Sequence, residues 1–163
     1  MKLIKKVIRH NIIKWLLVIL CMLGIFAMSH LDSVKSWYMT GKVLTTIEQT
    51  SDETEDLDFD EEIEYYSAQE DNMLVLRKLA HVLEFMILFL LMYNALYSPD
   101  RIKKSIYISA FLAVLYAVFD EVHQLFVVGR TGSIMDVVID SLGVLIGIVI
   151  VMGIIKIGRR KLL

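Results

Sequence analysis

The feature that most constrains this chain is a set of four long apolar runs, at residues 12–31, 79–97, 106–128 and 134–157. Each approaches or exceeds the ~20 residues that a helix needs to cross a ~30 Å hydrocarbon core. Backbone polar groups in lipid must be paired within their own segment, so such runs are helical. With 56% hydrophobic residues in 163, the chain is too apolar for a soluble domain. The sequence predicts an all-α fold, a single membrane domain (1–163) built as a four-helix bundle.

The first run has a second interpretation, because a basic segment precedes it and the small residues Ala27 and Ser29 lie near its end. These features are also those of a cleaved signal peptide. The bulky Met28 and His30 flank Ser29, however, and the run is long, so we expect a retained helix. Its Cys21 is the only cysteine, which excludes an intrachain disulfide and is best explained as a small buried residue.

Basic residues are distributed unevenly around the four predicted helices. They gather before the first helix, between the second and third, and after the fourth: Lys2, Lys5, Lys6, Arg9, Lys14, Arg101, Lys103, Lys104, Lys156, Arg159, Arg160 and Lys161. The positive-inside rule therefore places both termini in the cytoplasm. Contact with anionic lipids suits the same charges. The net charge of −2 gives no reason to expect a nucleic-acid partner.

The segment 32–76 is predicted to be a long acidic loop outside the cytoplasm, because it holds 13 of the 19 acidic residues. Its start, 34–50, could form an amphipathic helix on the membrane surface, and its middle is typical of a solvated chain. An EF-hand calcium loop has the spacing seen at Asp56, Asp58 and Asp60, which would be its first three ligands. Its sixth position would be Glu61 where glycine is required, and its twelfth would be Ser67 where glutamate is required. A calcium loop is therefore not expected.

Ionisable residues recur inside the last three helices, at spacings of three or four that place them on shared faces. The members are Arg77, His81 and Glu84; then Tyr116, Asp120, His123 and Gln124, with Glu121 beside them; then Asp136 and Asp140, followed by Gly143 and Gly147. At ~1.5 Å per residue, Glu84, Asp120 and Asp140 each lie about 10–12 Å from the outer ends of their helices. A charge at the bilayer centre costs about 2.5–3.5 kcal/mol, so we expect these carboxylates to meet in one polar pocket open to the outside.

Several kinds of chemistry suit such a pocket. His81 and His123 can exchange protons, and clustered carboxylates can act as general acids or bases. The same groups could hold a divalent cation. Arg77, Lys78 and Arg130 at the rim could hold a phosphate or carboxylate. The structural alternative is a network of ion pairs, Arg77 with Glu84 and Arg130 with Asp136, that fixes helix register.

These residues resemble the VanZ family in the patterns Arg77-Lys78-x-x-His81-x-x-Glu84, Asp120-Glu121-x-His123-Gln124, Gly129-Arg130 and Asp136-x-x-x-Asp140. Ser29 resembles the serine that ends the family's first helix. The likeness extends over roughly residues 12–155 and leaves out the acidic loop. It implies a small, multi-pass protein of the bacterial cytoplasmic membrane. The family's founding member is associated with low-level resistance to the glycopeptide teicoplanin, but the resemblance supplies no reaction.

The leading hypothesis is a cell-envelope protein that acts on lipid-linked or amphiphilic substrates at the outer leaflet, with an enzyme as one form of it. The expected catalytic set is His81, Glu84, Asp120, Glu121, His123, Asp136 and Asp140, with Glu84 or Asp120 as proton acceptor. The expected substrate-binding set is Arg77, Lys78, Gln124, Arg130 and Ser29. The alternative is a non-catalytic protein whose pocket holds a ligand, an ion or a partner helix. A transporter is disfavoured, because the four helices contain no inverted repeat.

Overall fold

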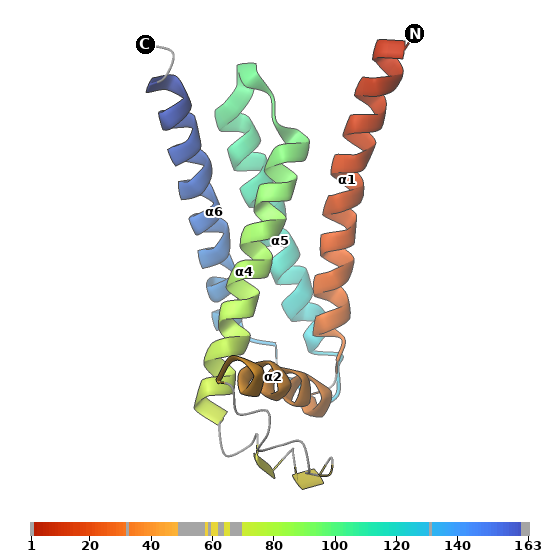
Figure 1. Cartoon of the computed structure of the whole chain (residues 1–163), viewed down its shortest axis with the longest axis vertical. Coiled ribbons are helices and arrows are strands. Elements are labelled where there is room, and N and C mark those ends of the chain that lie inside the picture. Colours follow the sequence, from red (N-terminus) through yellow and green to blue (C-terminus); the bar gives the residue numbers. More distant parts are fainter. Residues whose placement is uncertain are drawn as a thin grey trace.

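The computed structural model describes residues 2–31, 33–48, 58, 60, 61, 64, 65, 70–130 and 132–160. The elements follow the order α1 (Lys2–Ser29), α2 (Ser33–Glu48), α4 (Glu70–Leu96), the short 3₁₀ helix η2 (Pro99–Arg101), α5 (Ile102–Gln124) and α6 (Ile134–Arg160). The predicted all-α class is therefore confirmed. In Figure 1 the long helices α1, α4, α5 and α6 run up and down the molecule, and α2 lies across the end opposite both termini.

Three of the described helices contain a segment long and apolar enough to cross a membrane: Asn11–Ser29, Pro99–Gln124 and Ile134–Gly158. They correspond to the first, third and fourth predicted spans. The second predicted span, 79–97, falls almost wholly within α4, which is 27 residues long. α4 is also the central helix of the fold, because it contacts α1, α2, α5 and α6.

The connection between the first two predicted spans differs from the expected loop at 32–76. Residues 33–48 form α2, which agrees with the surface helix predicted at 34–50, and α4 begins at Glu70 rather than Leu79. The two helices pack against each other: Leu44 of α2 and Met73 of α4 are buried in one cluster, with Tyr38 and Leu76 beside them. Most of the acidic stretch 49–69, including Asp56 and Ser67, lies outside the described residues.

Apolar side chains are divided between the centre of the bundle and its outside. Each long helix contributes to the buried core, through Val18 and Ile25 of α1, Phe85, Leu88 and Phe89 of α4, Ala113 and Ala117 of α5, and Val144 and Val151 of α6. Many other large apolar side chains face outward, among them Ile12, Leu23, Phe111 and Val149. Water would make such a surface costly, whereas acyl chains solvate it.

Two glycines on one face of α6, Gly143 and Gly147, allow it to approach α4 closely. A methyl group at Gly143 would collide with the backbone carbonyl of Val82, and one at Gly147 would lie 2.5 Å from the Phe89 ring. Glycine at these positions lets two helix backbones pack without intervening side chains. This close approach brings the first turns of α6 next to His81 on α4.

Replacement of Gly143 with alanine should therefore force α6 away from α4. We expect a loss of about 1–3 kcal/mol of stability, the usual cost of overpacking. The thermal unfolding midpoint of the detergent-solubilised protein measures it. Gly24→Ala is the matched control, because a methyl group there meets nothing within 4 Å. Equal midpoints for the two variants would contradict the close α4–α6 contact.

Candidate functional site

A polar cavity of about 190 Å³ lies at the end of the bundle where α1 and α5 finish and α4 and α6 begin. These helix ends lie on the side of the molecule that α2 crosses, away from both termini (Figure 1). Eight of the predicted site residues line it, namely Arg77, Lys78, His81, Glu121, Gln124, Arg130, Asp136 and Asp140. Gly129 and Ile139 complete the wall. The structure thus gathers most of the predicted set from three helices into one space.

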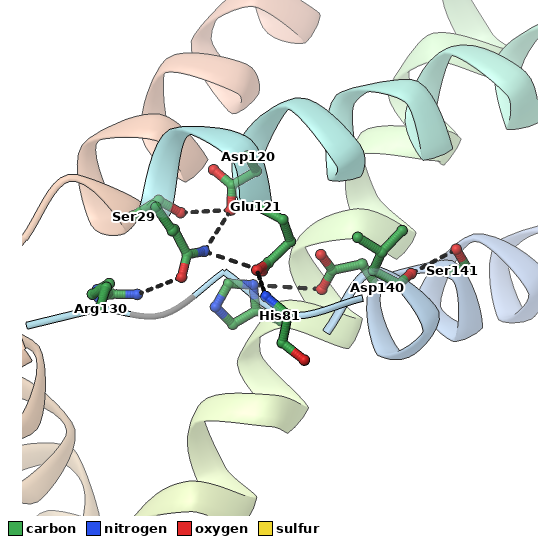
Figure 2. A network of polar contacts seen from close by, with 10 residues as sticks. Ser29, His81, Asp120, Glu121, Arg130, Asp140 and Ser141 are labelled. Atoms are coloured by element: carbon green, nitrogen blue, oxygen red, sulfur yellow. Dashed lines mark hydrogen bonds and ion pairs between the residues drawn. The ribbon is translucent and has the colours of Figure 1, made fainter. Parts of the chain in front are cut away.

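Asp120 is the carboxylate that ties α5 to α1. Its side chain is 1% exposed, and its Oδ2 accepts hydrogen bonds from Ser29 Oγ at 2.8 Å and Gln124 Nε2 at 3.0 Å. Figure 2 shows this junction between the end of α1 and the last turns of α5. Hydrogen bonding of this kind offsets the cost of burying a carboxylate. Ser29, which the family resemblance alone suggested, therefore has a direct partner in the site.

Arg130 holds the chain ends around the cavity together. Its Nη1 donates to Gln124 Oε1 at 3.3 Å, its Nε to the Leu31 carbonyl at 3.0 Å, and its Nη2 to the Met28 carbonyl at 3.4 Å. The carbonyls at a helix C-terminus lack partners within the helix and attract cations. The guanidinium predicted to hold an anion thus gives several of its donors to the end of α1.

Glu121 ties α5 to the start of α6. Its Oε2 accepts a hydrogen bond from the Ser133 backbone N–H at 2.8 Å, and its Oε1 accepts a longer one from Gln124 Nε2 at 3.3 Å. Ser133 in turn accepts a hydrogen bond from the Met135 N–H through its Oγ, as residues before a helix do. Gly132 is equally constrained, because a methyl group there would lie 2.5 Å from the Glu121 carbonyl oxygen.

Asp140 is fully buried, and it faces His81 across the cavity. Its Oδ1 lies 3.5 Å from His81 Nδ1, which is longer than an ordinary hydrogen bond. Within the described part of the chain, neither oxygen of Asp140 has a hydrogen-bond partner, and Asp120 Oδ1 also lacks one. Buried carboxylate oxygens rarely remain unsatisfied, so a donor from a ligand or from water is expected here.

An apolar groove of about 200 Å³ adjoins the cavity, and the two share Arg77, His81 and Arg130. The groove lies between the end of α1, α2 and the start of α4, and its apolar wall is formed by Met28, Met39, Val43, Leu76 and Ala80. Glu84 lines the groove rather than the cavity. The charges of Asp120 and Asp140 act on Glu84, so the three carboxylates lie within electrostatic range of one another, and their common depth in the membrane stays a prediction.

His123 is the one member of the predicted catalytic set that lies on the far flank of α5. Its ring stacks on Phe26 with centroids 4.3 Å apart, and its Nε2 is 3.3 Å from His30 Nδ1. It does not line the cavity. Sequence reasoning gave no role to His30 or to the Ser133 backbone. Ser133 could have been found from its place three residues before Asp136, because serine often precedes an acidic first helical turn.

Neither a metal site nor the predicted Arg77–Glu84 ion pair is found among the residues that the structure describes. No three His, Cys, Asp or Glu side chains converge closely enough there to hold a metal ion. Arg77 forms no ion pair with a carboxylate in the same ranges, although it lines both the cavity and the groove. Its charge therefore faces open space at the boundary between polar and apolar walls.

The fold and the site define a multi-pass membrane protein whose helices enclose buried carboxylates at one end of the bundle. The chain belongs to the VanZ/LLP1 family, whose model matches residues 14–156. That match extends from α1 to the last turns of α6 and includes every residue of the cavity wall. Searches of curated proteins and of solved structures returned no match.

Replacement of Ser29 with alanine should leave Asp120 Oδ2 with one donor fewer. We expect a loss of about 1–3 kcal/mol, the usual cost of an unsatisfied buried polar group, measured as a lower unfolding midpoint. Ser141→Ala is the matched control, because that hydroxyl donates only to the Val137 carbonyl of its own helix. If both variants unfold at the wild-type temperature, the α1–α5 tie contributes nothing.

Proposed function

We propose that the protein crosses the bacterial cytoplasmic membrane four times, with α4 as the additional span and both termini in the cytoplasm. Three apolar spans and the length and central position of α4 support this arrangement. α5 begins and α6 ends at the end of the bundle that carries the termini (Figure 1). The exposed lysines Lys103, Lys104 and Lys156 belong to these parts of the two helices, as the positive-inside rule requires. In this orientation the cavity opens toward the outer leaflet, beneath α2.

The function that the site supports best is binding of a cell-envelope amphiphile. The main support for the proposal is that the polar cavity and the apolar groove adjoin each other. Three side chains line both of them, namely Arg77, His81 and Arg130. An amphiphile matches that pair of spaces, because its head requires polar partners and its chain requires apolar ones. A purely polar solute would leave the groove empty.

The charges of the cavity specify the kind of head group. Arg77 and Lys78 provide cationic donors suited to a phosphate or carboxylate. Asp140 provides buried acceptor oxygens that lack hydrogen-bond partners in the described chain and have only His81 nearby at 3.5 Å, so it suits N–H or O–H donors. The proposed ligand therefore carries an anionic group close to an amine or hydroxyl group, as lipid-linked envelope molecules do.

Acid–base chemistry on the bound amphiphile is the second candidate function. It is favoured by the 3.5 Å separation of His81 Nδ1 and Asp140 Oδ1 inside the cavity, and by the charges of Glu84 and Asp120, which act on His81. A buried histidine beside a carboxylate is suited to moving a proton. A contribution to teicoplanin-type resistance, with which the family's founding member is associated, would follow if the amphiphile were an envelope precursor.

Competition binding to the purified full-length protein in detergent tests the head-group proposal. The probes are dihexanoyl phosphatidylethanolamine, the choline analogue without N–H donors, and dihexanoyl glycerol without phosphate. We expect them to bind in that order of decreasing affinity. Arg77→Gln should weaken both phospholipids at least about tenfold, since hydrogen bonds to charged groups contribute about 1.5–3 kcal/mol. Asp140→Asn should remove the preference for ethanolamine over choline.

Lys104→Gln serves as the control, because this exposed lysine lies at the opposite end of the bundle. Equal binding of all three probes, or unchanged binding by Arg77→Gln, would contradict the proposal. Incubation with envelope lipid extract distinguishes the two candidate functions. A new product that wild type forms and Asp140→Asn does not would establish catalysis, whereas saturable binding without product would establish a binding protein.

A further inference from the structure

A second groove lies at the opposite end of the molecule, between α5 and α6. It measures about 890 Å³, within the ~300–1,000 Å³ range of ligand pockets. Its wall is mostly apolar and includes Ile106, Ile148, Val149 and Met152. Gly153 forms part of the wall, and a side chain built there would meet nothing within 4 Å. The groove therefore has open space beside Gly153.

The charged residues of this groove are of one sign. Lys103 at the start of α5 and Lys156 near the end of α6 both line it, and no carboxylate does. Within the described ranges neither lysine forms an ion pair. Tyr107, whose side chain is 71% exposed, lies one helical turn from Lys103 on the same wall. Two lysines and a tyrosine at the mouth of an apolar groove match the boundary between head groups and acyl chains.

We propose that the groove between α5 and α6 is a binding site for an anionic phospholipid. The acyl chains lie along Ile148, Val149 and Met152, and the phosphate is held by Lys103 and Lys156. Basic pockets between membrane helices recognise anionic head groups in this way. The proposal is independent of the outer-leaflet cavity, since the two sites share no residue.

Charge also decides against a second copy of the chain as the occupant. A two-fold contact through this face would bring each lysine pair toward the same pair of the partner copy, because such interfaces use one patch twice. Like charges placed together at an interface cost several kcal/mol. An anionic lipid neutralises both lysines without that cost.

Native mass spectrometry of the full-length protein, titrated with phosphatidylglycerol or phosphatidylcholine, tests the site. Wild type should retain phosphatidylglycerol preferentially. Lys103→Gln and Lys156→Gln should each weaken its binding about fivefold, and the double variant about 25-fold, since a basic residue contributes about 1 kcal/mol toward anionic lipid. Lys104→Gln is the matched control, because this neighbouring lysine is exposed but does not line the groove.

A steric pair of variants tests the groove independently of charge. Gly153→Leu fills the apolar space and should abolish the preferred binding of phosphatidylglycerol. Gly158→Leu places the same side chain in equally open space outside the groove and should bind like wild type. Unchanged helical content by circular dichroism confirms that each variant folds.

Three results would overturn the proposal. The first is equal retention of both phospholipids by wild type. The second is an unchanged phosphatidylglycerol affinity in the double lysine variant or in Gly153→Leu. The third is a wild-type dimer that Gly153→Leu converts to a monomer, which would assign the groove to a second copy. None of these results bears on the head-group cavity.

Discussion

Burial of carboxylates inside a bundle of apolar helices is the constraint on which the rest of this structure depends. A charged group facing lipid would cost about 2.5–3.5 kcal/mol near the bilayer centre, so each acidic side chain must face protein or water. Asp120 meets the requirement by drawing donors from two helices, Ser29 of α1 and Gln124 of α5. Glu121 does the same with the backbone at the start of α6. Polar contacts therefore hold the helices together at the cavity end of the bundle, and apolar packing holds them together elsewhere.

The same constraint leaves part of the site unsatisfied. Asp140 is as deeply buried as Asp120, but its oxygens face His81 at 3.5 Å and lack hydrogen-bond partners in the described chain. Arg77 nearby has no carboxylate partner there either. A purely structural network would be expected to pair such groups with each other. Their separation across a cavity is the reason for the proposal that a donor and an anion from outside complete the pairs.

Much of the fold could be predicted from the sequence, because apolar length and helical spacing are local properties. The runs identified four helices, and the three- and four-residue spacings placed Asp136 with Asp140 and Asp120 with Gln124. The start of α4 could not be predicted in that way, because the helix begins at Glu70 and not at Leu79. Its first turns are polar, and they are held by Met73 against Leu44, a contact between segments that lie far apart in sequence.

Residue spacing also could not predict which side chains of α5 reach the cavity. Glu121 and His123 lie on opposite flanks of Asp120, since successive residues turn by about 100° around a helix. Spacing alone grouped His123 with Asp120, but α5 packs between α6 and α1. Glu121 lies on the flank of α5 that faces α6, and it lines the cavity. His123 lies on the other flank, where its ring stacks on Phe26 of α1. The contacts of Arg130 could not be predicted either, because the sequence does not show that its guanidinium donates to a carbonyl at the end of α1.

The most direct test of the account is an experimental structure of the protein in lipid nanodiscs by electron cryomicroscopy. The account predicts that Asp120 and Asp140 turn inward, with Ser29 and Gln124 in contact with Asp120 and head-group or water density between Arg77 and Asp140. Either carboxylate directed toward the acyl chains, or Arg77 joined to Glu84 across a closed site, would contradict it.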